Sequence, residues 1–252
     1  MCTLVCRWQP GEVKMLALRD ELASRSFDLP GAWWPDQPDV VGGRDRRGGG
    51  TWCAVDVAAG VSAVVLNRPD RRVAEPDAPS RGVLPLLAVR ELADWPAAAR
   101  LPGMASFNLV LATPTGLTWW AYDGQSLSGF ELPVGTHLFT PRGYSSGPTA
   151  DRFAAGVLPD PVADDSETET VWSDWLAVLR ESRPSADPQD LYVRIPVGTD
   201  VFETVFGQFI ASRPGQLRLD YLPRPADGGR WTVEHWTTRR PAGTAIRTKP
   251  VG

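Results

Sequence analysis

Short strand-like runs, separated by residues that favour turns, recur along most of the chain and constrain its fold more than any other feature. The first twenty residues are typical of a β-hairpin: Cys2 to Trp8 alternates, Gln9-Pro10-Gly11-Glu12 marks a turn, and Val13 to Leu18 follows as a second strand. Glycine and proline number 24 each, which supplies turns for many strands. Further strands are predicted at residues 53–57, 61–67, 106–112, 116–122, 126–132, 136–140, 191–197, 201–211, 216–222 and 229–236.

Two helical regions interrupt the strands. Gly82 to Arg100 carries apolar residues at helical spacing, and a second region has a weaker part, Thr149 to Val157, and a clearer part, Thr168 to Glu181. The acidic stretch from Asp164 to Glu169 is predicted to be a solvated loop, and Leu29 to Gly50 a loop rich in Pro, Gly and Trp. This order of elements predicts an α+β fold in which helices cover stacked sheets.

Composition and length exclude several classes of protein. No apolar run approaches the roughly 18 residues of a transmembrane helix, and a net charge of −4 argues against a nucleic-acid binder. No linker-like composition divides the chain, so one domain over residues 1–252 is predicted. Cys2, Cys6 and Cys53 are too few for a secreted disulfide framework, and the N-terminal residues lack the basic and apolar regions expected of a signal peptide. We therefore expect a cytoplasmic protein with reduced thiols, and, without a CxxC pair, no structural zinc site.

Cys2 is the residue with the clearest chemical potential. Removal of an initiator Met before a small residue would leave Cys2 with a free α-amino group, whose pKa is ordinarily near 8. That amine can take the proton of its own thiol and later return it, so one residue supplies nucleophile and base. The plainer interpretation is that Cys2 is only a small residue tolerated near a chain start.

The second predicted strand adds charge beside Cys2. Leu18-Arg19-Asp20-Glu21 places a guanidinium and two carboxylates at the end of the strand paired with the one that carries Cys2. Arg19 can hold an anion or lower the thiol pKa, and Asp20 can hold the ammonium group of an N-terminal residue. Alternatively, these charged residues only cap the next segment at the surface.

Several short motifs occur in a shared order and resemble the NRDE family, whose animal members are called transport and Golgi organisation protein 2. The motifs are Met1-Cys2, Arg19-Asp20-Glu21, Gly49-Gly50-Thr51-Trp52, Ser80-Arg81-Gly82 and Phe107-Asn108-Leu109. The family is similar to N-terminal nucleophile hydrolases of the choloylglycine hydrolase and penicillin V acylase type. The resemblance implies a four-layer α/β/β/α sandwich with two stacked, mostly antiparallel sheets.

The resemblance also implies the site residues. It assigns catalytic roles to four of them: Cys2 as nucleophile, Arg19 as a cation that contacts substrate or thiolate, Asp20 as partner of the α-amino group, and Asn67 as an oxyanion-hole donor. Trp52 and Asn108, which belong to two of the shared motifs, are the expected substrate contacts.

Three departures from the family pattern reduce the polarity expected of the site. Leu18 replaces the first letter of the NRDE motif, Pro141 stands where an Asn is expected, and Val205 stands where an Arg is expected. Pro has no amide donor, and an oxyanion hole that lacks one donor costs on the order of 100 to 1,000-fold in rate.

Two functional hypotheses follow from the sequence. The first is hydrolysis of a non-peptide amide of a small acyl substrate through an acyl-enzyme on Cys2, with no cofactor. The second, also implied by the resemblance, is a non-catalytic carrier of haem or acyl lipid; an aromatic cleft built from Trp33, Trp34, Trp119 or Trp120 would suit it. His137 and His235 are expected to be hydrogen-bonded structural residues, and a partner-binding scaffold has no specific support.

Overall fold

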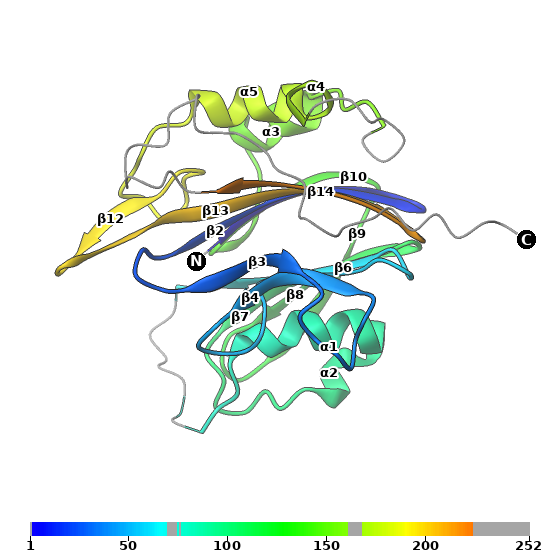
Figure 1. Ribbon diagram of the computed structural model, residues 1–252, viewed down its shortest axis with the longest axis vertical. Coiled ribbons are helices and arrows are strands. Elements are labelled where there is room, and N and C mark those ends of the chain that lie inside the picture. The colour runs from blue at the N-terminus through cyan, green and yellow to red at the C-terminus, as the bar shows by residue number, and fades with distance from the viewer. Residues whose placement is uncertain (1, 70–74, 76, 161–167, 224–252) are drawn as a thin grey trace, which may run out of the picture.

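Two seven-stranded antiparallel sheets stack face to face in the computed structural model (Figure 1), which describes residues 2–69, 75, 77–160 and 168–223. We call them sheet A and sheet B. Sheet A has the strand order β11-β10-β1-β2-β13-β12, with β14 also paired to β13. Its strands are β1 (Cys2–Gln9), β2 (Glu12–Leu22), β10 (Gly135–Thr140), β11 (Gly143–Ser145), β12 (Arg194–Val197), β13 (Asp200–Arg213) and β14 (Gln216–Pro223).

Sheet B is a meander in which each strand pairs with the next along the chain. Its strands are β3 (Phe27–Gly31), β4 (Val40–Asp45), β5 (Cys53–Asp56), β6 (Val61–Asn67), β7 (Phe107–Thr113), β8 (Gly116–Tyr122) and β9 (Leu127–Leu132). Alternate side chains of both sheets meet in a buried inter-sheet core that contains Cys2, Cys6 and Cys53. The hairpin predicted for the first twenty residues is confirmed. Cys6 lies on the same sheet face as Cys2.

Helices lie on the outer face of each sheet (Figure 1). Those over sheet A are α3 (Pro148–Ala155), α4 (Thr168–Val171) and α5 (Ser173–Glu181); those over sheet B are α1 (Leu84–Glu91) and α2 (Trp95–Ala98), with short 3-10 turns η1 (Arg81–Val83) and η2 (Leu92–Asp94). Each group of helices encloses a further hydrophobic core against its sheet. Trp172 and Trp175 pack on sheet A in one of these cores, and Trp95 packs on sheet B in the other. The prediction of an α+β fold with two stacked antiparallel sheets is confirmed.

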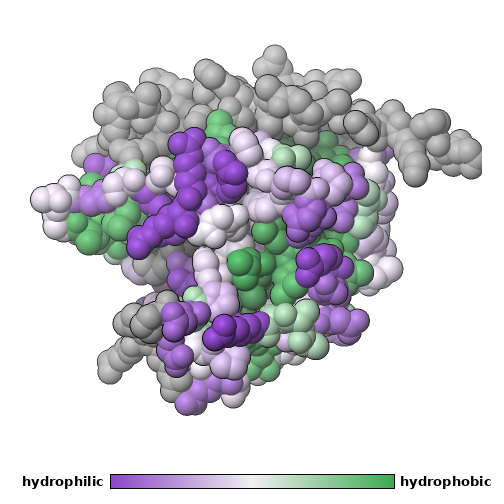
Figure 2. Space-filling model, turned by 60° about the horizontal axis from the view of Figure 1, so that its bottom comes forward, coloured by the Kyte–Doolittle hydropathy of each residue, from purple (hydrophilic) through white to green (hydrophobic). Residues whose placement is uncertain are grey.

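The face that carries α1 and α2 is mixed in character. Figure 2 shows apolar residues there surrounded by hydrophilic ones. A hollow of about 330 Å³ beside α1 is lined by apolar side chains that include Val83 and Leu87. No helix in the described part of the chain is long and apolar enough to cross a membrane.

The prediction of a loop from Leu29 to Gly50 is wrong, because β3 begins before it and β4 lies inside it. The sequence of β4, VVGGRD, hides its strand character because two glycines replace the apolar alternation. A Cβ at Gly42 would lie 2.4 Å from the carbonyl oxygen of Cys53, and one at Gly43 would lie 2.2 Å from the Trp52 ring. Close packing therefore requires both glycines. The strand predicted at 229–236, with His235, lies outside the described residues.

Candidate active site around Cys2

Cys2 and Arg19 lie side by side on neighbouring strands of sheet A. The antiparallel pairing of β1 with β2 places Cys2 opposite Arg19, as the hairpin predicts. β2 continues to Leu22, so Arg19, Asp20 and Glu21 lie on a strand rather than in a surface cap. A pocket of about 130 Å³ opens here, lined by Cys2, Arg19, Asp20, Glu21, Arg25, Asp45, Thr51, Trp52, Val65, Asn67, Ser80, Arg81 and Gly82.

Arg19 is a buried cation held by aromatic rings and carboxylates. Its guanidinium carbon lies 4.6 Å from the centroid of the Trp52 ring and 5.0 Å from that of Phe27. Its Nη2 lies 3.5 Å from Glu21 and 3.8 Å from Asp45. The other terminal nitrogen, Nη1, is buried and has no hydrogen-bond partner among the described residues. Arg19 thus has, at the pocket, a buried N–H donor group that no described residue accepts.

Trp52 adds a second donor of the same kind. The residue is 7% exposed, and its indole Nε1 is buried without a partner in the described part of the chain. Its ring packs edge-on against Phe27 and Phe206, which fixes its orientation. Because an unsatisfied buried donor costs about 1–3 kcal/mol, two such donors at one pocket indicate a place for an acceptor group of a ligand.

Asp20 is buried and held by a threonine from β13. The Thr204 hydroxyl donates a hydrogen bond to Asp20 Oδ1 at 2.7 Å, and its oxygen accepts one from the backbone N–H of Val193 at 3.0 Å. Burial raises the pKa of the Asp20 carboxyl to about 7, while the charge of the amino terminus, Thr204 and Arg19 oppose that rise. Asp20 therefore changes charge near neutral pH. No pattern in the sequence predicts this role of Thr204.

The Cys2 thiol is protonated at neutral pH in this environment. Burial raises its pKa, as does the Asp20 carboxylate, whereas the amino terminus, a backbone hydrogen bond from Asp20 and the charge of Arg19 lower it. The other two thiols are less available. Both are fully buried, and burial raises the pKa of Cys53 to about 12 and also raises that of Cys6. Cys53 is thus a buried thiol of the inter-sheet core.

Residues of the motifs Gly49-Gly50-Thr51-Trp52 and Ser80-Arg81-Gly82 form one wall of the pocket. The backbone N–H of Thr51 donates to the carbonyl of Gly82 at 2.8 Å, which joins the loop before β5 to the turn η1. A Cβ at Gly50 would lie 2.3 Å from the same carbonyl oxygen, so only glycine allows this approach. Asp45, on the unpredicted strand β4, completes the wall by accepting from Arg25 at 2.7 Å.

We predict that Gly50→Ala lowers the free energy of unfolding by about 2–3 kcal/mol, because the added methyl group has to push two backbone segments apart. Urea denaturation measures the change. Gly116→Ala is the matched control, since a Cβ there has its nearest neighbour, the Thr113 hydroxyl, at 3.8 Å. Equal stability of the two variants would contradict the role given to Gly50.

Of the two predicted substrate contacts and the predicted oxyanion donor, the structure places two residues in the pocket and one outside it. Asn67, at the end of β6, and Trp52 line the pocket with Cys2. Asn108 is not among the residues that line it. Its amide is buried between the sheets, where Nδ2 donates to the carbonyl of Pro141 at 3.1 Å and Oδ1 accepts from Trp119 at 3.1 Å. Asn108 thus has structural partners for both ends of its amide.

The three departures from the family pattern have different effects on the polarity of the Cys2 site. Leu18 packs into the core beneath the helices over sheet A, on the face away from the inter-sheet core, so its change removes no polar group from the Cys2 face. Pro141 offers only its carbonyl, which Asn108 occupies. Val205 belongs to the inter-sheet core with Cys2, so an apolar side chain replaces a cation there.

The aromatic cleft proposed for a carrier does not form. Trp119 and Trp120 are neighbours on β8 and therefore point to opposite faces. Trp119 stacks on Phe130 with ring centroids 4.9 Å apart, whereas Trp120 packs against Trp95 under the helices. Trp33 and Trp34 lie after β3, where Arg44 covers the ring of Trp33 and the indole of Trp34 donates to Gly49.

His137 has a hydrogen-bonded position, as predicted: its Nε2 lies 2.9 Å from the carbonyl oxygen of Pro133. Within the described ranges, no group of three or more His, Cys, Asp or Glu residues is placed to hold a metal ion.

Comparison with known proteins adds one finding to this geometry. The model of the family described as "Transport and Golgi organisation 2" matches residues 1–145, more than half of the chain. The match includes Cys2, Arg19, Asp20, Asn67 and both loops that line the pocket. No curated protein matches the chain.

Proposed function

The chain belongs to the transport and Golgi organisation 2 family, and from that premise we propose that it is an N-terminal cysteine hydrolase that cleaves a non-peptide amide bond of a small acyl substrate. One observation carries the proposal: Cys2 and Arg19 are register partners in a polar pocket that also contains a buried Asp20 and Asn67.

The layers of the molecule support this proposal. A helix layer, two stacked sheets and a second helix layer follow one another in Figure 1, with Cys2 at the start of a strand of sheet A that faces sheet B. This order is compatible with the α/β/β/α arrangement that the resemblance to N-terminal nucleophile hydrolases implies, and so supports the proposal.

The mechanism requires that Met1 be removed, so that Cys2 carries the α-amino group. The Cys2 Sγ then attacks the amide carbon while the amine takes the thiol proton. The amine returns that proton to the leaving nitrogen as the C–N bond breaks, which leaves a thioester on Cys2. Water attacks the thioester with the amine again as base, the C–S bond breaks, and the acid is released with the thiol restored.

The surrounding residues have separate tasks in this scheme. The carboxylate of Asp20, positioned by Thr204, stabilises the ammonium form of the amine. The unpartnered donors of Arg19 and Trp52 bind an acceptor group of the substrate, and Asn67 donates to the oxyanion.

The size and polarity of the pocket favour a small substrate over the carrier function. A volume of about 130 Å³ corresponds to roughly four water molecules. This space accommodates the reacting amide and a short acyl group, with the leaving amine towards solvent. A carrier of haem or acyl lipid needs a larger, more apolar cavity than one lined mainly by charged and polar side chains.

The direct test is turnover of short N-acyl amines, followed by release of the free acid. We expect wild-type protein to release acid and Cys2→Ala to release none, because the variant has no nucleophile. Cys53→Ala is the matched control, since Cys53 is fully buried and does not line the pocket. Equal acid release by Cys2→Ala and wild type would refute the proposal.

An independent prediction concerns the chain terminus and the thiols. Purified protein is expected to lack Met1, and iodoacetamide is expected to modify Cys2 first, because Cys2 lines a pocket whereas Cys6 and Cys53 have no exposed surface. Intact mass followed by peptide mapping measures both. Retention of Met1 in most molecules would remove the free α-amine that the mechanism needs.

A further inference from the structure

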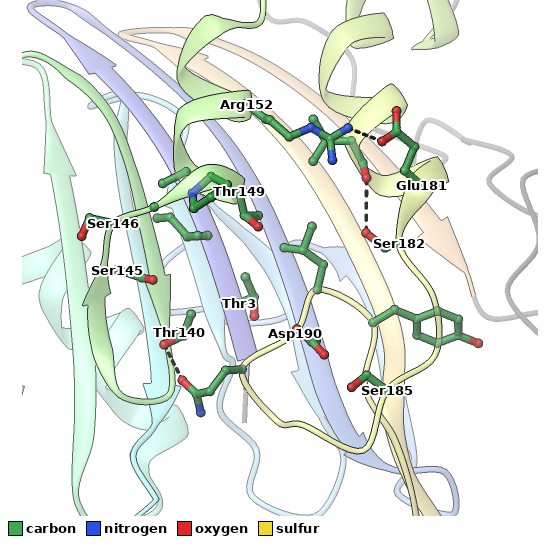
Figure 3. Close-up of a pocket in the computed structure, with 18 of the residues that line it drawn as sticks. Thr3, Thr140, Ser145, Ser146, Thr149, Arg152, Glu181, Ser182, Ser185 and Asp190 are labelled. Atoms are coloured by element: carbon green, nitrogen blue, oxygen red, sulfur yellow. Dashed lines mark hydrogen bonds and ion pairs between the residues drawn. The ribbon is translucent and has the colours of Figure 1, made fainter.

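A second, larger cavity lies on the other side of sheet A. Its volume is about 680 Å³, within the range of small-molecule sites. The walls come from β10 and β11, from the start of α3, and from the end of α5 with the segment that follows it. Figure 3 shows Ser145, Ser146 and Thr149 on one side and Ser182, Ser185 and Asp190 across from them.

The floor of this cavity holds a polar atom without a partner. Thr3 is 1% exposed, and its Oγ1 has no hydrogen-bond partner among the described residues. On the adjacent strand the Thr140 hydroxyl donates to Gln189 Oε1 at 2.7 Å, the contact drawn at the base of the cavity in Figure 3. A buried hydroxyl that faces a cavity without a partner indicates a polar group of a ligand.

The N-terminus of α3 forms another part of the wall. The N-cap is Gly147, no side chain of the described residues caps the helix, and Pro148 has no N–H. The first-turn N–H groups of Thr149 and Ala150 have no acceptor within the helix itself, and both residues line the cavity. A helix start of this kind attracts anions. Arg142, exposed in the turn between β10 and β11, adds a positive charge elsewhere in the lining.

Three arginines of the lining, Arg142, Arg152 and Arg183, stand against the two carboxylates of Glu181 and Asp190, so the lining has a surplus of one positive charge. Arg152 is 2.7 Å from Glu181, so that pair contributes little net charge (Figure 3). The hydroxyl groups along both walls can donate and accept hydrogen bonds, and the Asp190 carboxylate can accept them, so they suit an uncharged, hydroxyl-bearing portion of a ligand.

We propose that this cavity binds a small phosphorylated polyol, such as a sugar phosphate. The phosphate lies at the start of α3, and a ligand hydroxyl donates to Thr3 Oγ1 on the floor. Thr3 follows Cys2 on β1 and points to the opposite face, so this site is separate from the amide-cleaving pocket and does not depend on the proposed hydrolysis.

The test is calorimetric titration of the full-length protein with ribose 5-phosphate, ribose and inorganic phosphate at low salt. We expect ribose 5-phosphate to bind at least about tenfold more tightly than either fragment. Arg142→Ala should weaken its binding several-fold and reduce the salt dependence, because it removes the surplus positive charge of the lining. Arg90→Ala, which removes an exposed charge on α1, is the matched control and should change neither.

Thr3→Val distinguishes a ligand-binding role of the Thr3 hydroxyl from a purely structural one. Loss of an unpartnered hydroxyl should leave the melting temperature of the free protein equal or higher, while the affinity for ribose 5-phosphate falls several-fold. Equal affinity for ribose and ribose 5-phosphate, or dissociation constants weaker than about 10 mM for all three probes, would overturn the proposal. Cys2→Ala should bind as wild type, so this outcome and that of the hydrolysis test are distinguishable.

Discussion

Asp20→Asn is expected to stabilise the folded protein by about 2–4 kcal/mol at pH 8, and to leave it nearly unchanged at pH 4. Asn keeps the oxygen that accepts the Thr204 hydroxyl, so the substitution removes the ionisation and little else. Few substitutions of a buried polar residue should increase stability, which makes the sign of this effect informative.

The sign follows from the pKa of the carboxyl. Burial raises it to about 7 in the folded protein, against about 4 for an ordinary Asp. Between these values the folded state binds a proton that the unfolded state has lost. Stability therefore falls as the pH rises from about 4 to about 7, and above pH 7 the folded state carries the full cost of a buried carboxylate.

Urea denaturation from pH 4 to pH 8 measures the effect, and Asp28→Asn provides the opposite control. Hydrogen bonds from Arg46 and Arg44 lower the pKa of Asp28, so its contribution to stability is present above about pH 4 and is lost as the pH falls through the folded-state pKa. Asp28→Asn should therefore destabilise the protein at pH 8. Parallel stability profiles of wild type and Asp20→Asn would show that Asp20 does not titrate in this range.

The proposed mechanism accounts for a buried carboxylate that destabilises the fold, since it assigns Asp20 to the ammonium group of Cys2. Asp20→Asn should lower the pKa of that amine by removing the carboxylate that favours its charged form. Enhanced stability together with lost turnover is the combination that separates a functional residue from a structural one.

Much of the fold was predictable because most strands carry their own signal. β1, β2 and the strands from β6 to β10 combine apolar or alternating runs with Gly and Pro at their ends, and their ranges agree with the predictions within a few residues. The register of the first hairpin then placed Arg19 opposite Cys2. The centre of the candidate site thus depends on a local turn, which the sequence specifies well.

The rest of the site depends on contacts between distant segments, which carry no local signal. Thr204 reaches Asp20 from β13, and Asp45 comes from β4, where glycines required by packing interrupt the strand pattern. Asn108 belongs to a motif of the family but holds Pro141 and Trp119 instead of facing Cys2. The order of motifs along a chain therefore indicates a shared fold more directly than it indicates the role of each residue.

Arg19→Met is expected to slow alkylation of Cys2 several-fold at pH 7, because a cation opposite a thiol favours the thiolate and its loss raises the thiol pKa. Arg19→Lys should fall between the two, since it keeps the charge without the planar group that stacks on Phe27 and Trp52. The pH dependence of iodoacetamide labelling measures the pKa, after circular dichroism has shown that each variant folds.

Asp20→Asn should shift the same labelling profile in the other direction, because the Asp20 carboxylate raises the pKa of the Cys2 thiol. Arg25→Met is the matched control. Arg25 lines the pocket, but it pairs with Asp45 at 2.7 Å and is not the register partner of Cys2. Opposite shifts from Arg19→Met and Asp20→Asn, with little change from Arg25→Met, require that both side chains act on one thiol. Unchanged profiles in both variants would mean that the Arg19-Asp20 pair only supports the strand, and a non-catalytic binding function would then explain the pocket better than hydrolysis.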